Sequence, residues 1–140
     1  MKKIYFDTNI FIYNADKSSI YYNDTKTLIK YCQKNDISVV TSSETIQEII
    51  YYCQRINQLQ IGLRMSKLVI KSVEQLFPVT QNTIELYLQL VTKYPKIPSR
   101  DLIHVATSNL NGNLNIITYD KHLLNMGSIK AQKPDQFINN

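Results

Sequence analysis

Four acidic side chains in this 140-residue sequence lie at positions from which they could bind a divalent cation. Asp7 directly follows a short apolar stretch at 3–6, and Asp120 follows a second one at 114–118. We interpret both stretches as β-strands, and ligand-binding groups gather just beyond the carboxyl ends of parallel strands. The remaining two acids are predicted in helices and are Glu48 and Asp101.

These carboxylates have a chemical reason to meet. Crowded carboxylates repel one another, and some of them would hold a proton. Mg²⁺ or Mn²⁺ would remove that cost, since Mg²⁺ takes hard oxygen ligands and keeps several of its waters. A bound cation can lower the pKa of a water and neutralise charge developing on a phosphate. The four acids are therefore candidate metal ligands and catalytic residues for cleaving a phosphodiester bond.

Each acid also has a purely structural explanation. Asp7 could cap the helix that begins at 10–13, and Asp101 could stabilise the first turn of its own helix. Glu48 lies away from the apolar stripe of its predicted helix, which favours a solvated position. A position facing a cleft would require that side of the helix to border the edge of the sheet. The residues alone leave these alternatives open.

The elements that would position the acids alternate between strands and helices. The predicted strands cover 3–6, 37–41, 77–79, 114–118 and 128–131. After the start at 10–13, the predicted helices cover 24–34 with Asp24 as its cap, 43–55, 62–75, 81–93, 100–110 and a closing turn at 134–138. This alternation predicts an α/β fold with a mostly parallel sheet and helices on both faces. The length predicts one domain over 1–140.

Composition argues against several other classes of protein. No apolar run approaches the ~20 residues that span a bilayer, and the start is too poor in apolar residues for a signal peptide, so we expect a cytoplasmic protein with no membrane partner. Three glycines leave no room for a phosphate-cradling loop. Cys32 and Cys53 suggest neither a disulfide framework nor a zinc site. The two histidines, His104 and His122, make no obvious triad with a serine.

Charge and aromatic content are compatible with nucleic acid. The net charge of +5 and the isoelectric point of about 9.1 fit an acidic partner, and they equally fit simple solubility. Ten tyrosines could offer stacking surfaces to single-stranded RNA, or they could serve in the core and on helix faces.

Four segments together resemble the PIN-domain nucleases, and most closely the VapC-type toxins of prokaryotic toxin–antitoxin pairs. The segments are Asp7-Thr8-Asn9, Ser43-x-Thr45-x-x-Glu48, Ser99-Arg100-Asp101-x-x-His104-x-Ala106-Thr107 and Ile116-Ile117-Thr118-x-Asp120. The resemblance covers essentially the whole chain. It implies a three-layer α/β/α sandwich and a Mg²⁺- or Mn²⁺-dependent endoribonuclease. Its acidic ligands would be Asp7, Glu48, Asp101 and Asp120.

The resemblance also implies partners and supporting residues. A small antitoxin would cover the active-site groove, and a homodimer is common among such proteins. Asn9 matches the residue that supports the first Asp, and with Thr118 it would orient the carboxylates by hydrogen bonds. Three residues are candidate contacts to RNA phosphates, each with a solvated surface position as the alternative: Arg100, Lys121 and His122.

One position departs from the family pattern. Many members carry a further acid two residues after the last Asp, where this chain has His122. The departure leaves open whether one or two metals bind, and it motivates an alternative, a non-catalytic PIN-fold module that binds RNA or protein. Haloacid-dehalogenase-type phosphatases fit less well, because they need an Asp where this chain has Asn9. Receiver domains need an adjacent acidic pair that does not follow the first strand here.

Overall fold

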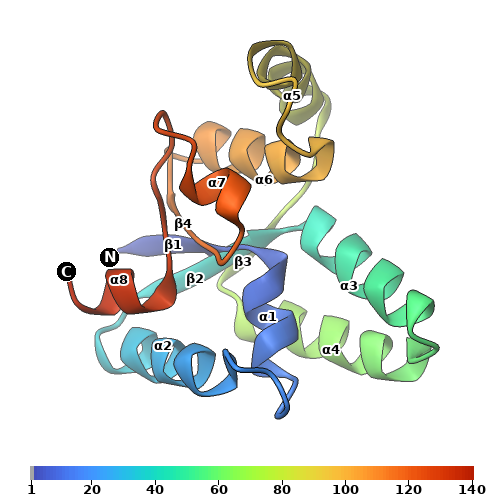
Figure 1. Cartoon of the computed structure of the whole chain (residues 1–140), viewed down its shortest axis with the longest axis vertical. Helices are drawn as coiled ribbons and strands as arrows, with labels where there is room; N and C mark the ends of the chain where they lie inside the picture. The colour runs from blue at the N-terminus through green and yellow to red at the C-terminus, as the bar shows by residue number, and fades with distance from the viewer. Residues whose placement is uncertain (1) are drawn as a thin grey trace.

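The computed structural model describes residues 2–140, and its centre is a sheet of five parallel strands (Figure 1). Their order across the sheet is β3-β2-β1-β4-β5. The strands are β1 (Lys3–Phe6), β2 (Ser38–Ser42), β3 (Gln75–Phe77), β4 (Asn115–Ile117) and β5 (Ala131–Gln132). Every pairing within the sheet is parallel, so the prediction of a mostly parallel sheet is confirmed.

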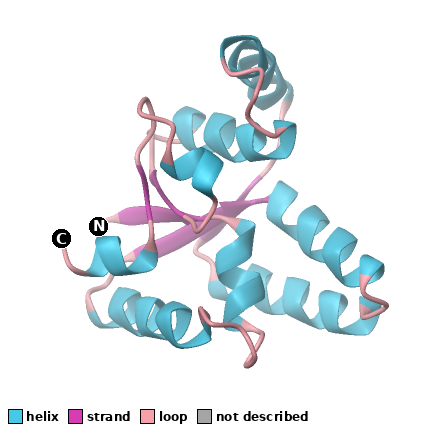
Figure 2. Ribbon diagram, in the orientation of Figure 1, coloured by secondary structure: helices cyan, strands magenta, loops and turns pink. Residues whose placement is uncertain are grey.

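Helices cover both faces of this sheet, which gives the expected three layers (Figure 2). They are α1 (Thr8–Asn14), α2 (Tyr22–Lys34), α3 (Ser43–Arg55), α4 (Leu59–Ser72), α5 (Gln81–Lys93), α6 (Ser99–Leu110), α7 (Lys121–Leu124) and α8 (Pro134–Ile138). Figure 1 shows α5, α6 and α7 on one side of the sheet and α1, α2, α4 and α8 on the other. Across 2–140, none of the helices combines the length and apolar character needed to cross a bilayer.

Strand β1 separates two apolar cores because its side chains alternate between the faces. Tyr5 is fully buried in the core beneath α5, α6 and α7. Ile4 and Phe6 are buried in the core beneath α1, α2 and α8. A third apolar cluster joins α3 to α4 through Ile49 and Val69. Burial on both faces is typical of a parallel sheet, and it explains the uninterrupted apolar run of β1.

Several predicted element ends were wrong. Strand β3 covers Gln75–Phe77 rather than 77–79, because the Glu74 amide already donates to the Val39 carbonyl at 2.8 Å and starts the pairing with β2. Consequently α4 ends at Ser72 rather than at 75. The last strand likewise lies at Ala131–Gln132 rather than at 128–131, because these two residues are the ones that pair with Ile116 and Ile117 of β4.

Helix starts also differed from prediction. Helix α2 begins at Tyr22, so Asp24 lies inside its first turn and is not the capping residue. Helix α4 begins at Leu59, three residues before the predicted start at 62. The preceding Asn57 has a positive φ of 57°, a left-handed conformation that Asn tolerates and that ends the turn after α3.

The strand order reverses between β1 and β4, and in open α/β sheets such a reversal defines a crevice at the carboxyl ends of the two strands. From β1 the chain moves outward through β2 and β3, then returns to the other side of β1 for β4 and β5. The segments after β1 and β4 therefore leave the sheet in opposite directions. The space between two such segments is where ligands bind in open α/β sheets. The Asp7 amide donates to the Ile117 carbonyl at 3.0 Å and joins the two strand ends.

Candidate metal centre

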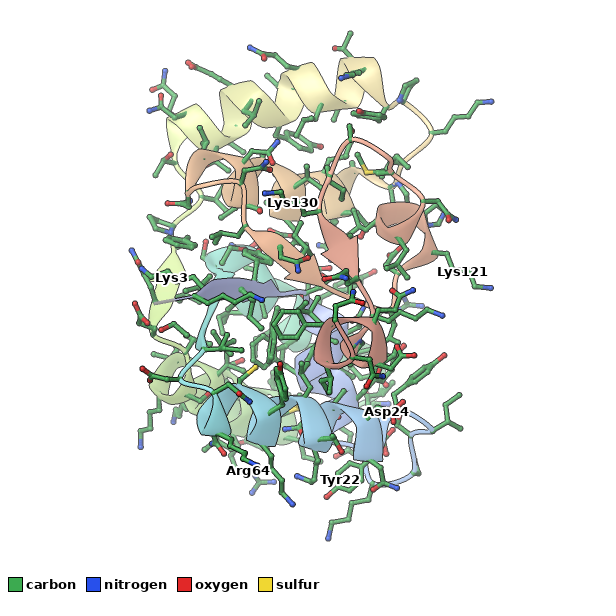
Figure 3. All side chains as sticks on the ribbon, turned by 90° about the vertical axis from the view of Figure 1, so that its left-hand side faces the viewer. Lys3, Tyr22, Asp24, Arg64, Lys121 and Lys130 are labelled. Atoms are coloured by element: carbon green, nitrogen blue, oxygen red, sulfur yellow. The ribbon has the colours of Figure 1, made fainter. Side chains whose placement is uncertain are left out.

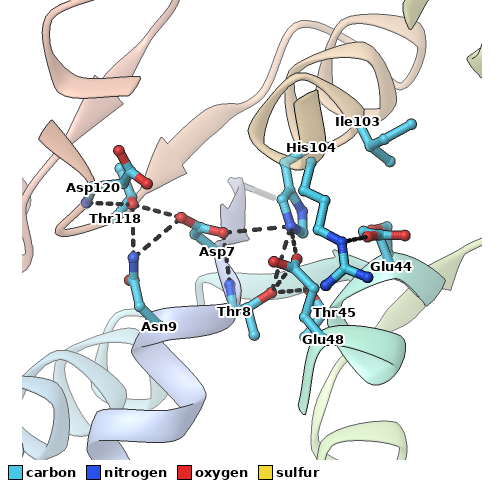
Figure 4. Close-up of polar contacts among 12 residues, drawn as sticks. Asp7, Thr8, Asn9, Glu44, Thr45, Glu48, Ile103, His104, Thr118 and Asp120 are labelled. Atoms are coloured by element: carbon cyan, nitrogen blue, oxygen red, sulfur yellow. Dashed lines mark hydrogen bonds and ion pairs between the residues drawn. The ribbon is translucent and has the colours of Figure 1, made fainter. Parts of the chain in front are cut away.

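Asp7 lies at the end of β1 with both carboxylate oxygens engaged (Figure 4). Its Oδ1 accepts the Thr8 amide at 2.8 Å, and its Oδ2 accepts the Thr118 hydroxyl at 2.6 Å and the Asn9 side-chain amide at 3.2 Å. Burial raises the pKa of Asp7, while the positive charge of His104 and the Thr118 hydrogen bond oppose that rise. Asp7 therefore caps α1 and also faces the crevice, so the two expected roles are compatible.

Thr118 and Asn9 link Asp7 to Asp120. Thr118 Oγ1 accepts the Asp120 amide at 2.9 Å and the Asn9 side-chain amide at 3.2 Å. Asn9 Oδ1 in turn accepts the Tyr119 amide at 3.3 Å. Both residues thus have the hydrogen bonds that an orienting role requires.

Asp101 lies in the first turn of α6, beside Asp120 and Asp7. Burial first, then the charges of these two neighbours, raises the pKa of Asp101 to about 8. Its Oδ2 is buried and has no hydrogen-bond partner among residues 2–140. A carboxyl that holds a proton near neutrality and leaves a buried oxygen unpaired fits a site that exchanges protons for a cation.

Glu48 faces the cluster, so the solvated position favoured by periodicity is wrong. Its side chain is only 20 % exposed. Its Oε1 accepts the Thr8 hydroxyl at 2.9 Å and also bonds His104 Nε2. Burial alone would raise the pKa of Glu48, but the hydrogen bond and charge of His104, with help from Thr8, lower it instead.

His104 forms a buried bridge between the carboxylates and the core. Its Nε2 lies 3.5 Å from Asp7 Oδ1, and its Nδ1 lies 2.5 Å from the Tyr5 hydroxyl, which donates to Ser42 at 2.9 Å. With its single proton given to Ser42, Tyr5 can only accept from His104, so the hydrogen-bond network assigns protons to both ring nitrogens. Burial opposes this charge, yet Tyr5, Asp7 and Glu48 raise the pKa of His104 well above its usual value.

Two groups of side chains have the spacing of metal ligands. Within each group, ligand atoms of all three residues lie within 4.8 Å of one another. One group is Asp7, Glu48 and His104, of which only the two carboxylates can act as ligands while both His104 nitrogens carry protons, and the other is Asp101, Asp120 and His122. Carboxylate oxygens suit Mg²⁺ and Mn²⁺, so the donor set and the unpaired Asp101 oxygen both fit a divalent cation.

The candidate phosphate contacts have different surroundings. Arg100 Nε lies 3.8 Å from Glu44 Oε1, and its guanidinium lies 4.8 Å from the centre of the Tyr51 ring. Lys121 and His122 are exposed at the start of α7, directly after Asp120. Figure 3 shows the Lys121 side chain extending outward from the protein.

Comparison with known proteins identifies the family. A sequence profile of the PIN domain matches residues 4–128. The chain belongs to the PIN domain family. The acidic cluster of this PIN domain therefore occurs in a fold that its relatives share.

Individual relatives are similar over most of this PIN domain. Ribonuclease VapC23 of Mycobacterium tuberculosis is 22 % identical over 120 residues, which cover 86 % of this chain and 94 % of the relative. The fold matches VapBC2 of Rickettsia felis, solved with a promoter DNA fragment, with a TM-score of 0.75, 14 % identity and coverage of 94 % and 98 %. It also matches VapC20 of M. tuberculosis, described as a sarcin-ricin loop cleaving toxin, with a TM-score of 0.74, 14 % identity and coverage of 86 % and 93 %.

The sequence interpretation missed the place of His104 in the PIN domain site. A signal was present, since Asp101 and His104 are three residues apart and lie on one face of a helix. The absence of a serine partner excludes a triad, but it does not exclude a place for His104 beside the carboxylates. The structure instead connects it to Tyr5 and Glu48.

Proposed function

We propose that this PIN domain is a Mg²⁺- or Mn²⁺-dependent endoribonuclease, and that it is the toxin of a toxin–antitoxin pair. The observation that carries the proposal is the gathering of carboxylates at the crevice beyond β1 and β4. Asp7, Asp101 and Asp120 would hold the cation, and Glu48 would complete the cage. The similarity to Ribonuclease VapC23 supports RNA as the substrate.

Each side chain in the proposed site has a separate task. When bound, the cation would supply a water of lowered pKa and neutralise charge on the phosphate. Thr118 and Asn9 hold Asp7 in place, and Asp101 would have to be deprotonated to serve as a ligand. His104 and Thr8 fix the Glu48 carboxylate. Lys121 and His122 at the rim would attract the RNA backbone, together with Arg100 once it leaves Glu44.

An antitoxin partner is supported by the fold matches, and in addition to the active-site groove that it would cover, the chain offers a second apolar surface for it. VapBC2, one of the similar structures, was solved as a VapBC assembly. In this chain an apolar cavity of about 530 Å³ opens between α1, α2 and α4, lined by residues that include Phe11, Ile29, Met65, Leu68 and Val69. Exposed lysines and an arginine flank it on α2 and α4. Such a groove suits an acidic segment with an apolar face, and the pair would act in the cytoplasm.

A homodimer would use a second surface. Tyr51 and Tyr52 on α3 are 48 % and 43 % exposed, and Ile56 and Leu59 continue this apolar area toward α4. Contiguous exposed apolar residues of this kind mark contact sites more often than isolated ones do.

The decisive experiment is cleavage of RNA by wild type and Asp7→Asn, with Mg²⁺, Mn²⁺ or EDTA. We expect wild type to cut RNA only with a divalent cation, and Asp7→Asn to cut it more than about 100-fold more slowly. Removing a residue that only hydrogen-bonds a metal ligand already lowers activity by about 10–100-fold, and Asp7 is proposed as a ligand itself. Asp36→Asn is the matched control, since Asp36 is exposed and its positive φ suits Asn. Circular dichroism checks that all three proteins are folded.

Two outcomes would contradict the proposal. Cleavage by Asp7→Asn at the wild-type rate would show that this carboxylate is not a catalytic ligand. If wild type cuts no RNA with Mn²⁺ or with EDTA, the result would favour the non-catalytic binding module.

A further inference from the structure

We propose that His122 is a direct metal ligand, so that the site it forms with Asp101 and Asp120 prefers transition-metal cations such as Mn²⁺ and Co²⁺ to Mg²⁺. The inference rests on the proposed function and deepens it by naming the class of cation. Its starting point is that ligand atoms of these three side chains lie within 4.8 Å of one another.

The geometry leaves His122 a short way from coordination. Adjacent ligands at about 2.2 Å from an octahedral ion lie about 3.1 Å apart, so the His122 and Asp120 donor atoms already have the spacing of neighbouring ligands, and the Asp101 donor atom lies within 4.8 Å of both. His122 Nδ1 lies 3.2 Å from Asp120 Oδ1, and the His122 amide donates to the same oxygen at 2.7 Å. The side chain is 55 % exposed, so it has room to turn.

The chemistry of the donors sets the preference. Mg²⁺ takes oxygen ligands and retains several waters, whereas imidazole nitrogen is a ligand of the first-row transition metals, for which the affinity of a given site rises from Mn²⁺ to Co²⁺. A site in which one donor is a nitrogen therefore loses affinity for Mg²⁺ relative to these ions. Asp101 adds a second carboxylate to this group, and its Oδ2 is buried without a hydrogen-bond partner within the described chain.

The other histidine is already committed. His104 is fully buried, with Nε2 bonded to Glu48 and Nδ1 at 2.5 Å from the Tyr5 hydroxyl. The sequence contains only these two histidines. An imidazole nitrogen detected on the bound metal can therefore be traced by changing His122 alone.

The test is pulsed electron paramagnetic resonance of tag-free protein loaded with one equivalent of Mn²⁺, which detects coupling to a coordinated ¹⁴N nucleus. We expect the coupling in wild type and its loss in His122→Asp, which keeps a ligand but makes it oxygen. Calorimetric titrations with Mn²⁺ and Mg²⁺ should show that the ratio of the two affinities falls at least about tenfold in His122→Asp. About tenfold is the smaller effect on metal affinity found when a residue hydrogen-bonded to a metal ligand is removed, and a ligand should matter at least as much.

Several results would overturn the inference. One is the absence of ¹⁴N coupling in wild type, provided that wild type binds Mn²⁺ and that Asp120→Asn abolishes this binding. That result would leave the nuclease proposal standing. Coupling that persists in His122→Asp would also overturn it. A third such result is a His122→Asp protein whose ratio of Mn²⁺ affinity to Mg²⁺ affinity is unchanged but which binds an RNA oligonucleotide more weakly than wild type does. His122 would then be a phosphate contact. Failure of wild type to bind either ion would remove both proposals.

Discussion

At the scale of single residues, His104 explains how carboxylates can be crowded in the metal-free protein. Asp7 is 4 % exposed and Glu48 has most of its side chain covered, yet both face the same imidazole. A buried pair of like charges is costly unless an opposite charge is supplied. The Tyr5 and Ser42 hydroxyls hold the ring so that it can supply that charge.

Removing His104 should therefore destabilise the protein. We expect His104→Leu to lower the free energy of unfolding by about 3–5 kcal/mol in EDTA, because it leaves Glu48 and Asp7 without their counter-charge. Tyr5→Phe removes only a hydroxyl and should cost about 1–2 kcal/mol. Urea denaturation of the three proteins measures both effects. Equal stability of His104→Leu and wild type would show that the imidazole carries no such charge.

The sequence predicted the four acids but not what surrounds them. Asp7 and Asp120 were placed by a simple rule, because each directly follows a strand and parallel strands share an edge. Glu48 was not predictable from its own helix, since periodicity describes only which side is apolar. Its position depends on how α3 meets α1 and α6, which is a property of packing between elements.

At the scale of elements, Gly62 sets the distance between α3 and α4. A Cβ added at Gly62 would lie 2.8 Å from Cys53 Cβ and 3.2 Å from its Sγ. The helix that the sequence predicts over 62–75 begins at this glycine. Here it lies inside the helix, where close approach of a neighbouring helix requires it.

Substitution of Gly62 should expose this requirement. Gly62→Ala should lose about 1–3 kcal/mol through overpacking, reduced by up to about 1 kcal/mol from the better helix propensity of alanine. Gly127→Ala is the control, because a Cβ there meets no atom within 4 Å. Urea denaturation gives both values. A Gly62→Ala protein more stable than wild type would mean that α3 and α4 can separate freely.

The strand ends were the least predictable part of the fold. Strand β3 has three residues and β5 has two, so neither carries enough alternation to be found by its pattern. Their limits are set by pairing with β2 and β4, partners that a local reading of the chain does not include. The longer helices α3, α5 and α6 carry several turns of periodic signal and were found almost to the residue.

At the scale of the whole molecule, the metal-free protein should become less stable as the pH rises. Asp101 has its pKa raised from 3.8 to about 8 on folding, so between these values the folded state binds more protons than the unfolded state. Its contribution is present below about pH 4 and is lost as the pH rises through 8. His104 acts in the same direction, since the stability from its raised pKa is lost above its folded value.

A cation should reverse this trend. We expect Mn²⁺ to raise the melting temperature more at pH 8.5 than at pH 6, because fewer protons then compete for the site. Asp101→Asn should melt higher than wild type at pH 8.5 in EDTA and should gain less from Mn²⁺. Thermal melts followed by circular dichroism measure these differences. A Mn²⁺ effect that is equal at the two pH values would contradict the exchange of protons for metal.

The central place of β1 has a consequence for biosynthesis. Asp7 and Glu48 come from the first half of the chain, whereas Asp101 and Asp120 come from the second, and β4 must lie beside β1 before the two halves meet. A nascent polypeptide still attached to its ribosome therefore has an incomplete set of acids until the segment after β4 has been made. An enzyme that destroys RNA would thereby spare the transcript from which it is being translated.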